Sequence, residues 1–208
     1  NKPEGTWSLM SYNNVIPQYM TMYEKYWYGG WIDSIPIITK SGTYEINTTL
    51  SSTNNCYKIP IKNEKWQFFI VEYREKSGVY EQSIPNSGLL IYRINHTFKH
   101  NLESDGMNLT FLYVFRKDGG RINGEYNDGN INNAAFSNEY DRTEFHISSN
   151  PPSFKINPYS AVNVYIKNIK KNQNIMSFDV RFCDADIIQY TNTINTPELL
   201  NASDKIIV

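Results

Sequence analysis

Several features that define common functional classes are scarce or missing in this sequence of 208 residues. Only two cysteines occur, Cys56 and Cys183, so a disulfide-rich scaffold is excluded. The formal net charge is −1, and 20% of the residues are charged, so the composition gives no electrostatic basis for binding nucleic acid or an anionic membrane. No apolar run approaches the roughly 18 residues that a transmembrane helix needs, so none is predicted.

Motifs for common catalytic chemistries are also missing. The sequence has no G-x-S-x-G, Walker loop, dinucleotide fingerprint or C-x-x-C. Its three histidines, His96, His100 and His146, form no H-E-x-x-H, the helical pair that binds zinc in many proteases. Zinc catalysis requires three ligands and an open position, so this sequence alone predicts no zinc site and no catalytic residue.

The residues that are present predict a mostly β chain with one N-terminal helix. Apolar residues at helical spacing predict a helix over 17–28, after Pro17 and before Gly29 and Gly30. Beyond residue 34 the period changes to two, and short runs bounded by turn residues predict a β-sandwich. The predicted strands cover 44–50, 57–61, 66–74, 88–95, 109–116, 143–147, 162–169 and 175–182. Residues 184–208 lose this pattern and are interpreted as an extension or linker, with one further strand at 187–191.

Two sequence segments resemble a known family. Residues 6–14 read TWSLMSYNN, which is similar to a Met-turn, and residues 66–95 read WQFFIVEYREKSGVYEQSIPNSGLLIYRIN. The second segment contains a Glu-x-Arg at the end of an aromatic strand, followed by Pro-x-Ser-Gly-Leu-Leu-Ile and an aromatic residue. Both resemble the immune inhibitor A family of secreted zinc metallopeptidases (peptidase family M-six). Between them, Pro17, Lys25 and Gly30-Trp31 keep the family's order, and the resemblance extends from Gly5 to Phe182.

This resemblance implies a division of the chain and a function. Residues 1–35 would hold the Met-turn and helix of a metalloprotease catalytic domain, residues 36–183 the β-sandwich, and 184–208 the extension. Met10 would form the floor of the active site, and Tyr12 would be a candidate oxyanion stabiliser. The zinc ligands would lie in an upstream half of the same protein, and the complete enzyme would hydrolyse protein substrates outside the cell or at its surface. The chain by itself is expected to be inactive.

The family often has His where this chain has Arg93, and Asp where it has Asn95. Because of this departure, the resemblance does not support a metal-binding or polar role for Arg93 and Asn95. A second function from another class therefore stays open: a degenerate, non-catalytic extracellular module with a structural or adhesive role. The presence or absence of H-E-x-x-H in the upstream sequence would distinguish the two hypotheses.

Glu72 and Arg74 fall on one face of an apolar strand, and Arg93 falls on an apolar face of the next strand. Buried charges must be paired, so we expect Glu72 to form an ion pair with Arg74 or, across the strands, with Arg93. The alternative is that these charges contact a substrate.

Residues 117–138 are rich in Gly, Asn and Asp and are expected to form a long loop. Asp118, Glu125 and Asp128 are candidate calcium ligands there, although the EF-hand spacing is missing. The alternative is a solvated loop.

Two covalent modifications, a disulfide and N-glycosylation, depend on the compartment in which the protein resides. Cys56 and Cys183 would form a disulfide in an oxidising compartment, worth about 4–5 kcal/mol, or would remain two free thiols. N-x-Ser/Thr sequences, the acceptors of N-glycosylation, occur at Asn47, Asn95, Asn108 and Asn201. The abundance of Asn, Ser and Thr makes such sequences common by chance, so they do not establish secretion.

Overall fold

The computed structural model describes residues 4–12, 16–98, 110–122, 125–154 and 162–183. Two antiparallel sheets form the framework of this part of the chain. The four-stranded sheet has the order β2-β3-β4-β5, with β2 at Cys56–Pro60, β3 at Gln67–Arg74, β4 at Gly88–Asn95 and β5 at Leu112–Val114. The three-stranded sheet has the order β1-β9-β8, with β1 at Gly42–Asn47, β8 at Val164–Asn172 and β9 at Ile175–Phe182.

Short elements complete the fold. The α-helix α1 spans Met22–Trp27, and the 3-10 helices are η1 at Gly5–Trp7, η2 at Ile131–Asn133 and η3 at Asn138–Tyr140. A small hairpin joins β6, Gly120–Ile122, to β7, Glu125–Asn127. None of the helices in the described ranges has the length and apolar character to cross a membrane.

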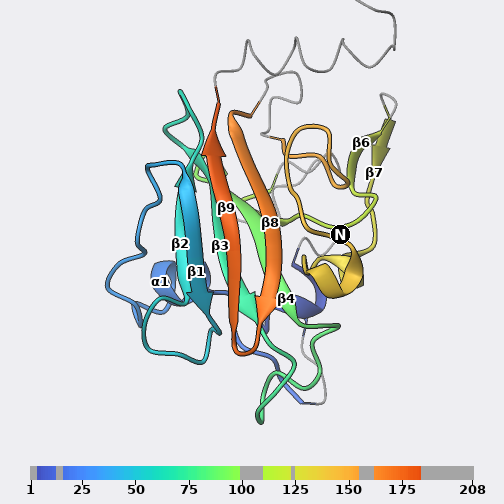
Figure 1. Cartoon of the computed structure of the whole chain (residues 1–208). Helices are drawn as coiled ribbons and strands as arrows, with labels where there is room; N and C mark the ends of the chain where they lie inside the picture. Colours follow the sequence, from blue (N-terminus) through green and yellow to red (C-terminus); the bar gives the residue numbers. More distant parts are fainter. Residues whose placement is uncertain (1–3, 13–15, 99–109, 123–124, 155–161, 184–208) are drawn as a thin grey trace, which may run out of the picture.

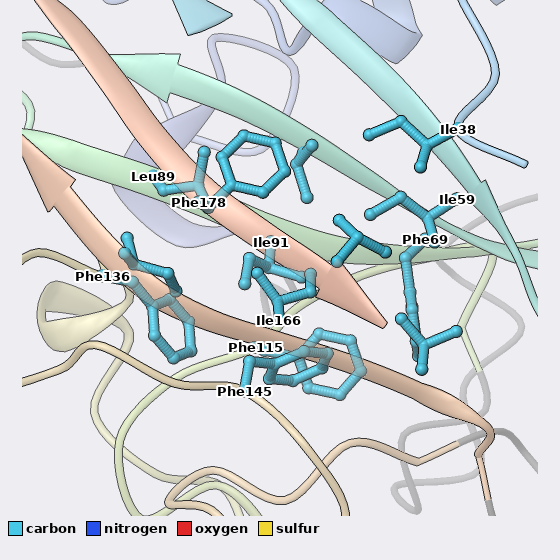
Figure 2. Close-up of a cluster of buried hydrophobic side chains, with 14 of the residues drawn as sticks. Ile38, Ile59, Phe69, Leu89, Ile91, Phe115, Phe136, Phe145, Ile166 and Phe178 are labelled. Atoms are coloured by element: carbon cyan, nitrogen blue, oxygen red, sulfur yellow. The ribbon is translucent and has the colours of Figure 1, made fainter. Parts of the chain in front are cut away.

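The two sheets pack face to face, as Figure 1 shows for β1, β9 and β8 in front of β2, β3 and β4. Aromatic and branched side chains from both sheets and from the 134–145 segment fill the interface (Figure 2). Four phenylalanines are central: Phe115 lies 5.5 Å from Phe69 and 4.6 Å from Phe145, between ring centroids, and Phe136 lies 5.8 Å from Phe145. The β-sandwich-like, mostly β fold predicted from the sequence is therefore confirmed.

The opposite face of the four-stranded sheet is also covered. Trp7 and Tyr23 from the N-terminal segment pack there on Ile70, Leu90 and Tyr92. Every residue of β3 and β4 is consequently buried. The four-stranded sheet is thus the middle of three layers, with the three-stranded sheet on its inner face and residues 4–12 and 16–28 on its outer face.

The helix is shorter than predicted. It begins at Met22 because Thr21 forms a capping box with Glu24, in which each side chain bonds the other residue's backbone N–H. Pro17 and Tyr19 precede the helix without regular secondary structure.

Two other predictions were wrong in part. Residues 143–147 form a single bridge between Phe145 and Ile166 instead of a strand, and the loop predicted over 117–138 contains the β6–β7 hairpin. The strand predicted at 187–191 lies outside the described residues.

Candidate functional site

The Met-turn-like segment forms a tight turn, but its methionine points outward. The backbone N–H groups of Ser11 and Tyr12 bond the Ser8 carbonyl at 3.1 and 3.0 Å, and the Met10 N–H bonds the Ser8 Oγ at 3.1 Å. Trp7 is fully buried, whereas Met10 is 61% exposed. A Met-turn methionine is expected to be buried against the following helix, and Met10 is not, because Trp7 and Ser8 anchor this turn to the sheet and Met10 lies at its tip.

Trp7 is held at two points. Its indole N–H donates to the Ile131 carbonyl at 2.7 Å, and its own carbonyl accepts a bond from Arg74 Nη1 at 2.8 Å. Gly5 turns the chain into this position with φ +53°, and a Cβ at that residue would meet Ile131 Cγ1 at 2.6 Å. The chain entering the turn is therefore fixed to both η2 and β3.

Arg74 is the centre of a buried polar group, called here the Arg74 cluster: Ser8, Thr21, Glu24, Glu72, Arg74, Glu81 and Tyr92. Its guanidinium forms a bidentate pair with Glu81, from Nε at 2.8 Å and from Nη2 at 2.6 Å. Nη1 also bonds Glu72 at 3.1 Å, and Nη2 bonds the Tyr19 carbonyl at 3.4 Å. The predicted ion pair between Glu72 and Arg74 is confirmed.

Arg93 does not join this cluster. In the β3–β4 register Arg93 is opposite Phe69, and Glu72 is opposite Leu90, so Arg93 faces the interface between the two sheets. Its guanidinium lies over the rings of Tyr113 and Phe154, at 5.6 and 5.1 Å from their centroids. The proposed Glu72–Arg93 pair is wrong because side chains alternate between faces along each strand.

Glu72 connects the sheet to the helix. Its Oε2 accepts bonds from the Met22 N–H and from the Tyr92 hydroxyl, both at 2.7 Å. The same Tyr92 hydroxyl accepts the N–H of Tyr23 at 3.2 Å. The first turn of α1 is therefore seated on β3 and β4 by buried hydrogen bonds, in addition to apolar contact.

Glu24 connects the helix to the turn. Its Oε2 accepts bonds from the Ser8 hydroxyl at 2.6 Å and from the Thr21 hydroxyl and N–H at 2.8 Å each. Burial raises the pKa of Glu24, although these hydrogen bonds oppose the shift. The residue is thus a buried acid that serves as a common acceptor for two segments.

The Arg74 cluster places two carboxyl groups, those of Glu72 and Glu81, against one guanidinium. Burial lowers the pKa of Arg74, but Glu81 and Glu72 outweigh burial and raise it overall, so the guanidinium stays charged. Lys25 supplies a second cation at the edge, with Nζ 4.7 Å from the Tyr19 ring centroid. Burial lowers the pKa of Lys25, while Glu72 raises it. The cluster is a densely bonded structural unit that joins the turn at Trp7 and Ser8 and the start of α1 to the sheet.

Sequence reasoning missed Glu24 and Glu81. The Thr21-x-x-Glu24 pattern was a readable capping signal. Glu81 comes from the segment between β3 and β4, and nothing in its local sequence indicates that it would turn inward to Arg74.

Protein-family models do not match this chain, and curated protein sequences do not match it either. The resemblance described above therefore rests on its own motifs.

The candidate metal ligands are not gathered into a site in the part of the chain that the structure describes. There, His, Cys, Asp and Glu form no group of three or more that would hold a metal ion. Asp118 accepts a bond from the Asn150 amide at 2.7 Å, Asp128 is exposed, and the side chain of Glu125 lies outside the described residues. Calcium binding by this segment stays a prediction.

His96 and His146, the two histidines that the structure describes, lie in different parts of the fold. His96 contacts the outer face of the four-stranded sheet, where its Nε2 is 2.7 Å from the Tyr23 hydroxyl. His146 stacks on Tyr165 at 5.0 Å between centroids, and His100 lies outside the described residues.

The two cysteines are free thiols, so the candidate disulfide is wrong for this structure. Cys56 pairs with Glu72 in the β2–β3 register and shares its outer face, whereas Cys183 follows β9 in the other sheet. The four-stranded sheet itself separates them. Burial, with Glu72 adding to it, raises the pKa of Cys56 to about 12.

One candidate glycosylation site is also wrong. Asn95 is fully buried, and its Oδ1 accepts bonds from the backbone and hydroxyl of Thr97 at 3.0 and 2.8 Å. A glycan has no room there. Asn47 is partly exposed and donates to the Thr53 carbonyl at 3.0 Å, while Asn108 and Asn201 lie outside the described residues.

Proposed function

We propose that this chain is the Met-turn and β-sandwich part of a secreted zinc metalloprotease, in which it scaffolds an active site completed by upstream sequence. The observation that carries the proposal is the bond from Arg74 to the Trp7 carbonyl. It joins the two family-like segments, which lie far apart in the sequence, in one buried cluster. A shared structural role explains why a Glu-x-Arg and a Met-turn would occur together.

The exposed tip of the turn supports the same proposal. Leu9, Met10, Tyr12 and Ile16 are large apolar residues that are exposed around this turn. Their backbone is nevertheless fixed, because the Leu9 N–H bonds the Tyr19 carbonyl at 3.4 Å and Ser83 bonds the Ile16 carbonyl. A rigid turn with an apolar tip is a suitable surface for another part of the protein to pack on.

The described residues of this chain supply no ligand set for zinc. In the proposed enzyme, zinc would supply an activated water for peptide-bond hydrolysis. This chain would contribute the apolar surface of Met10 beneath the ligands, with Tyr12 as a candidate donor to the developing oxyanion. The Arg74 cluster would hold both in place.

The test uses the full reading frame that contains this chain. The purified protein should contain stoichiometric zinc by elemental analysis and should cleave casein in a reaction that EDTA stops. Residues 1–208 alone should do neither. A full-length protein without zinc and without cleavage would favour the alternative of a structural or adhesive extracellular module.

Met10 provides a sharper test in the same protein. Met10→Glu should reduce cleavage at least tenfold, whereas Met10→Leu should retain most of it. Val79→Glu is a matched control, because Val79 is 70% exposed and lies outside the turn. Since Met10 is exposed in this chain, thermal melts of residues 1–208 should be the same for all three variants. Equal cleavage by Met10→Glu and wild type would contradict the proposed role.

A further inference from the structure

Tryptophan is unusually exposed in this protein. The sequence has four tryptophans, and Trp7 is fully buried. The other three, Trp27, Trp31 and Trp66, are 51%, 70% and 52% exposed, and Tyr28 is 52% exposed. Large aromatic side chains are normally covered, so a group of exposed ones marks an interaction surface. These four residues are called the tryptophan patch.

His96 lies between two members of the patch, Trp27 and Trp66. The His96 ring lies 4.7 Å from the Trp27 ring, between centroids, and its backbone N–H donates to the Trp66 carbonyl at 2.8 Å. Trp31 folds back at the end of α1, where its N–H bonds the Lys25 carbonyl at 3.0 Å. Its ring lies against Gly29, at which an added Cβ would meet Trp31 Cδ2 at 2.9 Å.

The patch has a rigid base. The Tyr23 ring lies 5.6 Å from Phe68 and 6.1 Å from Phe111, and His96 lies 5.5 Å from Phe111. Tyr23 and Phe111 are buried in the outer core of the four-stranded sheet. Trp27 stacks on Tyr23 at 6.3 Å and Tyr28 lies 6.1 Å from Phe111, between centroids, so this base positions these two exposed rings, which lowers the entropy cost of binding.

Lysines lie beside the rings. Lys58 Nζ is 3.8 Å from the Phe68 ring centroid, and Lys65 Nζ is 5.1 Å from the Trp66 centroid. Glu64 is next to Lys65 in the sequence, and its carboxylate, which accepts a bond from the Gln67 amide at 3.4 Å, offsets one of these two positive charges. Glu24 of the adjacent helix is buried in the Arg74 cluster. The local charge of the patch is therefore more positive than the chain's net charge of −1 indicates.

We propose that the tryptophan patch docks this protein on the headgroup region of an anionic phospholipid surface. Tryptophan and tyrosine prefer that depth because an apolar ring carries a polar N–H or O–H group that stays hydrated. Lysine stems can lie along the rings while their ammonium groups reach the anionic lipids. The net charge of −1 gave no indication of membrane binding, because it averages the lysines near the patch with acidic residues elsewhere in the chain.

The test is binding of purified residues 1–208 to vesicles, with tryptophan fluorescence as a second readout. Vesicles of phosphatidylcholine with 30% phosphatidylglycerol (roughly the anionic content of a charged leaflet) should co-sediment the protein and shift its emission to the blue. Pure phosphatidylcholine should bind several-fold less. Trp31→Ala with Trp66→Ala should reduce co-sedimentation at least tenfold, and Lys58→Glu with Lys65→Glu should abolish the preference for anionic lipid.

Val79→Ala, equally exposed but outside the patch, should bind like wild type. Circular dichroism melts check that each variant folds; if the double tryptophan variant does not, Trp31→Ala alone replaces it, since this ring is the most exposed. Absence of vesicle binding, or binding that the tryptophan and lysine variants leave unchanged, overturns the proposal. Self-association that depends on Trp31, without vesicle binding, would assign the patch to a protein partner and overturn it too. Neither readout depends on zinc or proteolysis, so failure here is distinct from failure of the proposed function.

Discussion

The two faces of the four-stranded sheet are held in different ways. The inner face meets the three-stranded sheet through an interlocked set of apolar rings and branched side chains (Figure 2). The outer face meets residues 4–12 and 16–28 through apolar contact and also through the Arg74 cluster. Apolar contact is strong but tolerates rearrangement, whereas buried hydrogen bonds fix one geometry. The difference indicates that the buried hydrogen bonds of the outer face fix the position of the turn at Ser8–Tyr12. Apolar contact alone would stabilise the segment without fixing its position in this way.

The largest loss of stability is expected from a substitution that disrupts the outer face. Arg74→Ala leaves Glu72 and Glu81 buried without their guanidinium and should lower the free energy of unfolding by about 3–5 kcal/mol. Native-state hydrogen exchange should show the amides of Met22 and Tyr23 opening well before those of β9. The exposed Arg181→Ala serves as control in urea melts and should change stability by about 0.5 kcal/mol or less. Unchanged stability of Arg74→Ala would mean that the cluster is solvated.

A comparable change on the inner face should behave differently. Ile91 is fully buried between the sheets, and Ile91→Ala should cost about 2–5 kcal/mol through lost burial and the cavity left behind. Hydrogen exchange should then rise in both sheets together, because no single segment is released. If the amides of Met22 and Tyr23 open first here too, the two faces are not independent.

The helix cap should have a smaller effect. Thr21 accepts the Glu24 N–H at 3.2 Å and donates to its carboxyl at 2.8 Å. Thr21→Ala should lower stability by about 1 kcal/mol, and Thr21→Ser should restore most of it because Ser keeps the hydroxyl. A urea melt of each variant measures this. Equal losses in both variants would assign the effect to the lost methyl group instead of the cap.

Glu24 gives the smallest and most specific prediction, the pH dependence of stability. Because burial raises its folded-state pKa above the usual 4.5, the native state binds its proton more tightly than the unfolded state. The resulting stabilisation is present below pH 4.5 and is lost as the pH rises through the folded pKa. Glu24→Gln keeps an acceptor for Ser8 and Thr21, so its stability relative to wild type should increase with pH.

Urea melts between pH 4 and pH 8 check that sign. The exposed Glu45→Gln provides a matched loss of one carboxylate. A constant difference between Glu24→Gln and wild type across this range would show that Glu24 ionises without a cost from burial.

The sequence predicted the strands better than the site. The bounds of β4 and β9 agree with the prediction because each is a strong periodic run closed by turn residues. The Glu72–Arg74 pair followed from alternation along one strand. Glu81 could not be foreseen, since its inward turn depends on a long-range partner. The outward direction of Met10 was equally hidden, because a turn's sequence does not tell which of its side chains faces the sheet.

The pairing of β1 with β9 has a consequence for how the chain acquires its structure. Tyr44 of β1 lies opposite Phe178 of β9. The hydrogen bonds between these two strands can therefore form only after β9 is present. Closing so long a loop is entropically costly, and contacts of this separation slow folding. We expect the hairpin of β3 and β4 to assemble early and the three-stranded sheet late. During synthesis β1 would therefore remain an unpaired edge until nearly all of the described chain had left the ribosome.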